Sequence, residues 1–406
     1  MRIRASRSHP APSAEPPTAP PPRIRASPFL LVSLAVVLAA TLYPTADRAV
    51  AGWGFCVLCG GRGLADALLN MALFVPLGAA LARLGVRPVR AIAGIAMLSA
   101  SIELAQLVIP GRDPAPPDLL FNTLGGMIGY AAGGHLAGLL RPSPRGAERL
   151  AIAWSIAFAL TVAATGWLTA PSPPPGPYVG QWTPEIAGDP PLSGRVLEAR
   201  IGQLPVGDGA LGPEAAVQRA LARADPLSVE WIVGWRMSGA APLVRIVGRD
   251  GAEAAELFIR GEDAILIQRT RATVLRMDHP RYAAPGILRG LSPGDTLRLT
   301  VRMDGRAAVF STDAGFTMRD AFGPGRGWML LWSVMETPHS TARLLDALWI
   351  ALWMLPLGLW MRRGTSSVGA AAVAVAGAAL RRRVDAAREG PAPRRPASSR
   401  HAHGQA

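Results

Sequence analysis

The sequence contains no lysine, so arginine supplies nearly all of its positive charge. The formal net charge is +14, but the excess lies in the two terminal segments. Residues 1–27 hold five arginines against one acid and residues 362–406 hold nine against two, whereas residues 171–343 hold 19 against 18. Nucleic-acid-binding proteins carry a basic patch on a folded domain. This distribution therefore argues against nucleic acid as a partner and is typical of a GC-rich genome.

Cysteine is also scarce, because Cys56 and Cys59 are the only two. A lone Cys-x-x-Cys with no second Cys or His pair is weak support for a metal or redox centre. An inert structural pair, a local disulfide and redox chemistry all stay open. No Asp/Asn cluster has the spacing of a calcium loop, and no adjacent carboxylate pair indicates a glycosidase. We therefore expect no metal and no cofactor.

Hydrophobic residues make up 50% of the chain, and the mean hydropathy is +0.25. The long apolar stretches fall at 28–43, 64–84, 89–109, 118–140, 149–170 and 344–361. Most of them reach the ~20 residues that a membrane-spanning helix needs. The first is short, so a cleaved signal peptide is an alternative there. A seventh stretch, Ser367–Leu380, is too short to span.

Arginines accumulate in alternate loops, which predicts the orientation of the helices. Positive residues favour the cytoplasmic side of a membrane. The arginine-rich segments precede the first stretch, follow the second and fourth, and follow the sixth. We therefore expect a multi-pass protein of the cell inner (cytoplasmic) membrane with both termini cytoplasmic and residues 171–343 extracytoplasmic.

Polar residues interrupt three of the apolar stretches at the ends that this topology places outside. They are Asp66, Asn70, Glu103, Gln106, Arg112, Asp118 and Asn122. A carboxylate such as Glu103 costs roughly 2.5–3.5 kcal/mol at the centre of a bilayer and is a functional candidate by default. We expect a polar site at the outer leaflet, with purely structural hydrogen bonds between helices as the alternative. Arg112 is expected to neutralise a carboxylate or to bind a phosphate or sugar acid through its planar guanidinium.

Glycines repeat at four-residue intervals in the fourth stretch, as Gly125/Gly129, Gly129/Gly133 and Gly134/Gly138. Small residues at this spacing let two helix backbones approach closely. The fourth helix is therefore predicted to pack tightly against a neighbour.

Four segments of this region resemble the VanZ-like family. They are DALLNMALFVPLG at 66–78, SIELAQ at 101–106, IPGR at 109–112 and DLLFNTLGG at 118–126. The resemblance covers about residues 28–140 and implies a bacterial membrane protein. The founding member of the family is associated with resistance to the glycopeptide teicoplanin.

Residues after the fifth helix have the pattern of an all-β domain. Alternating apolar residues predict strands at 229–235, 243–247, 256–259, 264–269, 296–301, 307–311 and 328–334. Their rhythm, with LSPGDTLRLTVRMDG at 291–305, resembles a concanavalin A-like or laminin-G-like jelly roll. Such folds often bind glycans, although most of the tryptophans are expected in the core.

The expected fold is a membrane α-helical bundle of about six transmembrane helices plus an extracytoplasmic all-β jelly-roll sandwich. Its parts are a disordered basic N-terminus at 1–27, a four-helix VanZ-like domain at 28–140, a fifth helix at 149–170, a Pro-rich linker at 171–177, a concanavalin A-like domain at 178–340, a sixth helix at 344–361, and a basic tail at 362–406 that is disordered or partly helical. The partners expected are the lipid bilayer and a cell-wall glycan or lipid-linked precursor.

The leading functional hypothesis is recognition of that envelope glycan or precursor by a binding protein. The first alternative is a membrane enzyme that acts on a lipid-linked headgroup with Glu103 or Asp118 as acid or base. A membrane location raises the pKa of a carboxylate, which suits it to this role. The second is a transporter, although no pair of broken helices in matching halves is apparent.

Overall fold

The computed structural model describes residues 27–44, 57–58, 60–112, 114–184, 192–235, 239–332 and 339–363. Cys56, Cys59 and the stretch Ser367–Leu380 lie outside these residues, as do most of the two basic terminal segments.

Six long helices occupy the six apolar stretches. They are α1 (Pro28–Leu42), α2 (Gly63–Arg83), α3 (Pro88–Gln106), α4 (Pro116–Leu140), α5 (Pro144–Leu168) and α8 (His339–Met361). Four of them begin with a proline in the first turn, where the missing N–H costs no hydrogen bond. Of the described helices, α2, α3, α5 and α8 are long and apolar enough to cross a membrane. α1 has only 15 residues, and the glycines of α4, with Asn122 and His135, lower its hydropathy.

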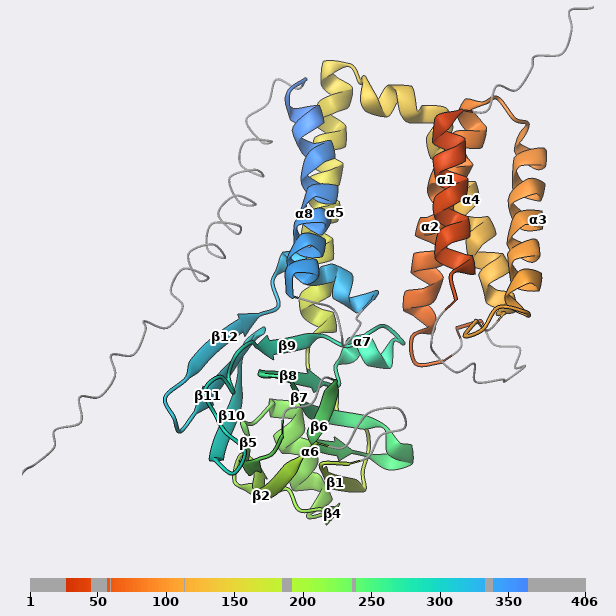
Figure 1. Cartoon of the computed structure of the whole chain (residues 1–406). Coiled ribbons are helices and arrows are strands. Elements are labelled where there is room, and N and C mark those ends of the chain that lie inside the picture. Colours follow the sequence, from red (N-terminus) through yellow and green to blue (C-terminus); the bar gives the residue numbers. More distant parts are fainter. Residues whose placement is uncertain are drawn as a thin grey trace, which may run out of the picture.

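The helices form two units (Figure 1). α1–α4 make a bundle with a core of Val37, Phe74, Leu77, Ile95 and Ile102. α5 pairs with α8 through tilted and edge-to-face aromatic contacts, with the ring centroids of Trp154 and Trp353 5.1 Å apart. Two hydrogen bonds join the units at the end remote from the β-domain: Trp360 Nε1 donates to the Leu139 carbonyl at 2.6 Å, and the Arg363 guanidinium donates to the Leu140 carbonyl.

Glycines set the contact between α2 and α4. A Cβ placed on Gly125, Gly129 or Gly133 would come within 2.6 Å of a backbone carbonyl oxygen of α2, and one on Gly78 within 2.0 Å of the Gly126 carbonyl. The two backbones therefore touch, as the four-residue spacing predicts. A Cβ placed on Gly134 or Gly138 would meet no atom within 4 Å, so these two glycines take no part in the contact.

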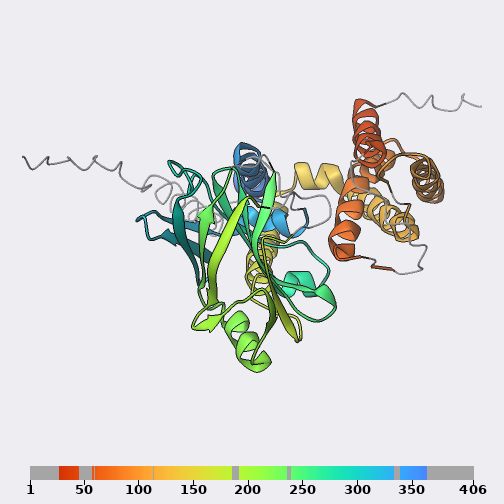
Figure 2. The same ribbon diagram turned by 60° about the horizontal axis from the view of Figure 1, so that its bottom comes forward.

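The β-domain is a sandwich of two antiparallel six-stranded sheets. One sheet has the order β4-β1-β6-β7-β8-β9 and the other β12-β11-β10-β5-β2-β3. The strands are β1 (Tyr178–Trp182), β2 (Gly194–Ile201), β3 (Leu204–Pro205), β4 (Gly209–Leu211), β5 (Leu227–Val233), β6 (Ala240–Val247), β7 (Glu253–Arg260), β8 (Asp263–Gln268), β9 (Arg281–Ala284), β10 (Thr296–Asp304), β11 (Ala307–Thr312) and β12 (Thr317–Ala321). Short helices accompany them: α6 (Glu214–Arg223), α7 (Arg271–Val274), η1 (Arg249–Gly251) and η2 (Pro324–Leu330). Figure 2 shows the sandwich below the α5–α8 pair and beside the bundle.

Alternation along the strands builds the core. In β5, Leu227, Val229, Trp231 and Val233 are buried and the intervening residues are not. The sequence predicted a strand at 229–235, but β5 ends at Val233. Trp235 therefore lies outside the strand, and its side chain is 76% exposed. The strand predicted at 328–334 is also wrong, because residues 324–330 form the 3-10 helix η2. Its proline and glycines favour this turn, which buries Trp328 against the end of the sandwich.

Residues 171–177 contain no helix or strand and lie on the sandwich. Tyr178 Oη donates to the Pro174 carbonyl at 2.5 Å, and the Arg249 backbone N–H donates to Pro175 at 3.0 Å. The segment therefore joins α5 to β1 while packed against the β-domain.

A buried ion network ties the sandwich to α8. Arg326 lies 2.6 Å from Asp320 Oδ1 and 3.8 Å from Asp346 Oδ2, and Asp346 also accepts from Trp328 Nε1 at 2.9 Å. Asp346 belongs to α8, whereas Asp320 belongs to β12. Charged groups out of water need such partners, so the network holds the helix and the sandwich together.

Candidate functional site

The polar residues singled out in the sequence gather at one end of the bundle. α2 and α4 begin there and α3 ends there, on the side where the sandwich lies (Figure 1). We call Asp66, Asn70, Glu103, Gln106, Asp118 and Asn122 the polar cluster. Gln106 and Asn122 are buried, Asn70, Glu103 and Asp118 are half-buried, and Asp66 is exposed.

Three helices contribute carboxylates that interact with one another. The Asn70 side chain donates a hydrogen bond to Asp118, which also interacts electrostatically with Asp66 and with Glu103. Glu103 Oε2 accepts from the Ala115 backbone N–H at 2.7 Å. Because Ala115 is the N-cap residue of α4, Glu103 on α3 also fixes the start of the next helix.

Two buried amides lie beneath the carboxylates. Asn122 Nδ2 donates to Ser99 Oγ at 2.9 Å, and Gln106 Nε2 donates to the Thr41 carbonyl at 3.0 Å. Neither Asn122 Oδ1 nor Gln106 Oε1 has a hydrogen-bond partner among the described residues. Leaving a buried polar atom unpaired costs about 1–3 kcal/mol. Each oxygen is therefore an acceptor available to a donor that enters the cluster.

Arg112 does not join this cluster in the way expected. Its Nε donates to the Tyr43 carbonyl at 2.9 Å and one terminal nitrogen donates to the Ala40 carbonyl at 2.8 Å. These carbonyls close the end of α1, where backbone acceptors lack helical partners and the helix dipole favours a cation. Arg112 therefore caps α1, and among the described residues no carboxylate pairs with it.

The cation beside the cluster is instead Arg62, which the sequence reasoning missed. Its Nε lies 3.2 Å from Asp278 Oδ2 on the sandwich, and its guanidinium donates to the Leu331 carbonyl at 3.3 Å. It also interacts electrostatically with Asp66, four residues on. That i,i+4 spacing is a sequence signal that would have found the Arg62–Asp66 pair.

The sandwich touches the bundle next to the cluster. The Arg276 carbonyl accepts from the backbone N–H groups of Leu64 and Ala65 at 3.1 and 3.3 Å, so it caps α2. The Arg276 guanidinium donates to the Leu58 carbonyl. Together with the Arg62–Asp278 pair, these contacts hold the sandwich against the end of α2 where Asp66 lies.

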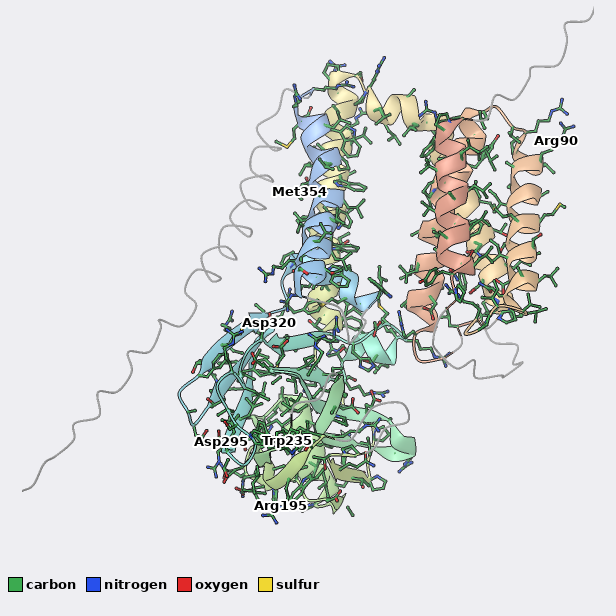
Figure 3. The ribbon with its side chains drawn as sticks, in the orientation of Figure 1. Arg90, Arg195, Trp235, Asp295, Asp320 and Met354 are labelled. Carbon is green, nitrogen blue, oxygen red and sulfur yellow. The ribbon has the colours of Figure 1, made fainter. Side chains whose placement is uncertain are left out.

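A second candidate site is a shallow hollow on the sandwich. It measures about 320 Å³ only when the open solvent at its mouth is counted, so it is a surface depression and not an enclosed pocket. Its lining residues are Leu192, Ser193, Trp231, Val233, Gly234, Trp235, Ile259, Gly261 and Leu288. The Trp235 side chain is the exposed aromatic group at this hollow, which lies away from the helices (Figure 3). Among the described residues no group of three His, Cys, Asp or Glu side chains could hold a metal ion.

Comparison with known families identifies the helical part. The VanZ/LLP1 family model matches residues 23–135, a range that contains α1–α3, most of α4 and the whole polar cluster. Comparisons with curated proteins and with solved structures gave no match. The two-sheet sandwich lies outside the matched range and is consistent with a jelly roll. The N-terminal part of the chain is therefore a VanZ/LLP1 membrane domain, to which an all-β sandwich is attached.

Proposed function

We propose that the protein recognises a saccharide-bearing molecule of the bacterial cell envelope, either a cell-wall glycan or a lipid-linked precursor. The observation that carries the proposal is the position of the polar cluster, at the end of the VanZ bundle and beside the docked sandwich. A sugar of a headgroup at the membrane surface would reach the cluster, while the rest of the saccharide would reach the sandwich.

The chemistry of the cluster favours a ligand rich in hydrogen-bond donors. Asp66, Glu103 and Asp118 supply carboxylates, and Gln106 and Asn122 supply unpartnered amide oxygens. The nearby arginine that would attract a phosphate, Arg112, is occupied by α1. Sugar hydroxyl and ammonium groups satisfy such acceptors, whereas a phosphate would meet like charge.

The hollow supports the saccharide part of the proposal. Trp235 presents an exposed indole ring. Its backbone N–H donates a hydrogen bond to Ser193 Oγ at 3.1 Å, which holds the backbone of this residue in place. An aromatic ring with an apolar face and polar neighbours suits the apolar face of a sugar ring. We propose that this ring contacts the glycan.

The charge distribution supports a location in the inner membrane with both termini cytoplasmic and the sandwich outside. The arginines at the start of α3, including Arg90, lie at the end of the bundle remote from the sandwich (Figure 3). Positive residues accumulate on the cytoplasmic side, so the opposite end, with the polar cluster, would face outward.

Binding to the full chain in nanodiscs tests the proposal. The probes are a polyprenyl diphosphate carrying a disaccharide and the same polyprenyl diphosphate without sugar, each detected on the protein by native mass spectrometry. Glu103→Gln and Asp118→Asn should each weaken binding of the sugar-bearing probe roughly 10- to 100-fold, the effect of losing a charged hydrogen bond of about 1.5–3 kcal/mol. Glu148→Gln removes a carboxylate from the first turns of α5 and serves as the control.

Equal binding of both probes, or unchanged binding in Glu103→Gln and Asp118→Asn, would refute the proposal. Conversion of the probe to a new product would favour the enzyme alternative, in which Glu103 or Asp118 transfers a proton. A link to teicoplanin resistance is a separate part of the proposal, tested by comparing the susceptibility of cells that express the wild-type chain with cells that express Glu103→Gln.

A further inference from the structure

A short turn of the sandwich combines exposed apolar and basic side chains. We call residues 271–276, which contain α7, the α7 turn. Val274 is 52% exposed and Leu275 42% exposed, and the side chains of Arg271 and Arg276 are exposed on either side of them. The turn contains no acidic residue. Val274 and Leu275 are neighbours in the sequence, so the turn presents one small apolar patch between two arginines.

The contacts of the α7 turn fix its level relative to the helices. Arg271 stacks over the ring of Trp167, next to the last residue of α5, with 4.9 Å from Cζ to the ring centroid. At the other end of the turn, the Arg276 carbonyl caps the first turn of α2. α5 and α2 belong to different helical units and both qualify as membrane spans. The α7 turn therefore lies at the level where two membrane helices end (Figure 1).

The other exposed apolar residues of the sandwich strengthen this placement. Among its described residues, the large hydrophobic side chains that are exposed are Leu197, Trp235, Val274, Leu275 and Trp332. Trp332 follows Leu331, whose carbonyl accepts from Arg62 at the start of α2. Three of the five are thus near the ends of the helices, and Trp167 on α5 is 54% exposed beside them.

We propose that the α7 turn is a membrane-interface anchor for the sandwich. Val274 and Leu275 enter the boundary between lipid headgroups and acyl chains, and Arg271 and Arg276 meet the phosphates of phospholipid headgroups. Interfacial segments place apolar groups some 5–10 Å into this boundary and basic groups beside the anionic headgroups. Tryptophans such as Trp167 and Trp332 gather at the same depth. The anchor depends on neither the saccharide nor the side of the membrane on which the sandwich lies.

Site-specific depth measurement in the full chain tests the anchor. Val274→Cys is made in a chain that also carries Cys56→Ser and Cys59→Ser, labelled with an environment-sensitive fluorophore and reconstituted in nanodiscs. The matched control is Leu197→Cys in the same background, since Leu197 on β2 is similarly exposed at 40%. Spin-labelled lipids with the label at the headgroup or at the fifth acyl carbon act as quenchers, and iodide reports exposure to water.

The anchor predicts that spin-labelled lipid quenches the fluorophore at position 274 several-fold more than that at 197, and that iodide does the reverse. Adding Arg271→Gln should reduce lipid quenching at 274 in discs that contain anionic lipid. Equal lipid quenching at 274 and 197 would overturn the proposal. Protection of 274 from both lipid and iodide would also overturn it, because the turn would then be covered by protein, such as a second copy.

Discussion

Replacing Gly129 by alanine should strongly destabilise the VanZ bundle. A Cβ at Gly129 would lie 2.0 Å from the Val75 carbonyl oxygen, 2.7 Å from its carbon and 2.8 Å from its Cα. All three atoms belong to the backbone of α2, so no side-chain rotation relieves the contact. The helices would have to separate by about 1 Å or more, as overpacked cores do when they shift their backbones.

The same helix supplies the control. Gly134 has no atom within 4 Å of an added Cβ, so Gly134→Ala gains only the helix propensity of alanine, about 1 kcal/mol. Overpacking costs about 1–3 kcal/mol, and the rigid backbone contact at Gly129 places Gly129→Ala at the upper end. Both variants gain this helix propensity, so they should differ by the overpacking cost alone, about 3 kcal/mol.

Thermal unfolding of the full chain in mild detergent, followed by fluorescence-detected size exclusion, measures this difference. Gly129→Ala should lose its monodisperse peak at a temperature several degrees below wild type, and Gly134→Ala at or above it. If the two variants melt together, the backbone contact between α2 and α4 does not exist as described.

Three further predictions concern the sandwich and its attachment. Arg326→Met removes the cation shared by Asp320 and Asp346 and should lower the free energy of unfolding by about 3–5 kcal/mol. The control, Arg319→Met, breaks an exposed ion pair and should lower it by at most about 1 kcal/mol. Equal losses of stability in thermal unfolding would contradict the network. Burial raises the pKa of Tyr282 to about 12, so its contribution to stability is present below pH 10 and is lost as the pH rises towards 12. Tyr282→Phe should accordingly flatten the alkaline loss of stability, measured as melting temperature against pH, and an unchanged profile counts against this assignment. Arg62→Met removes the ion pair with Asp278 and should speed hydrogen exchange at the first amides of α2, and unaltered exchange would mean that the sandwich is held by other contacts.

The apolar stretches and the alternation of apolar residues predicted most of the helices and strands, because both patterns follow from which side chains of an element are buried. The apolar stretches located all six long helices because a spanning helix must be continuously apolar over its length. Alternation located most of the long strands, because one face of each strand is buried. The strand predicted at 328–334 was wrong because a short apolar run has no period that distinguishes a strand from a helix. Pro324 and the neighbouring glycines favour the 3-10 helix η2 instead.

The site was predictable only in part. The sequence predicted that the polar residues of three helices lie at the same end of the bundle, and the Asn122–Ser99 hydrogen bond joins α4 to α3 there. The long-range partners of Arg112 and Arg62 were not predictable, because they depend on how distant segments meet. Arg112 reaches carbonyls 69 and 72 positions away, and Arg62 reaches one 269 positions away. No periodicity in the sequence records such pairings.

The cap that Arg276 places on α2 has a consequence for the making of the protein. Arg276 and Leu58 lie 218 positions apart along the chain. A ribosome that adds about 5–20 residues per second needs roughly 10 to 45 s to cover that distance. During this interval the first amides of α2 have no acceptor from the sandwich, and the bundle exists without its final partner. The newly made membrane domain is thus completed only when a later segment arrives, and a chain cut short before residue 276 would carry a VanZ bundle with an open end.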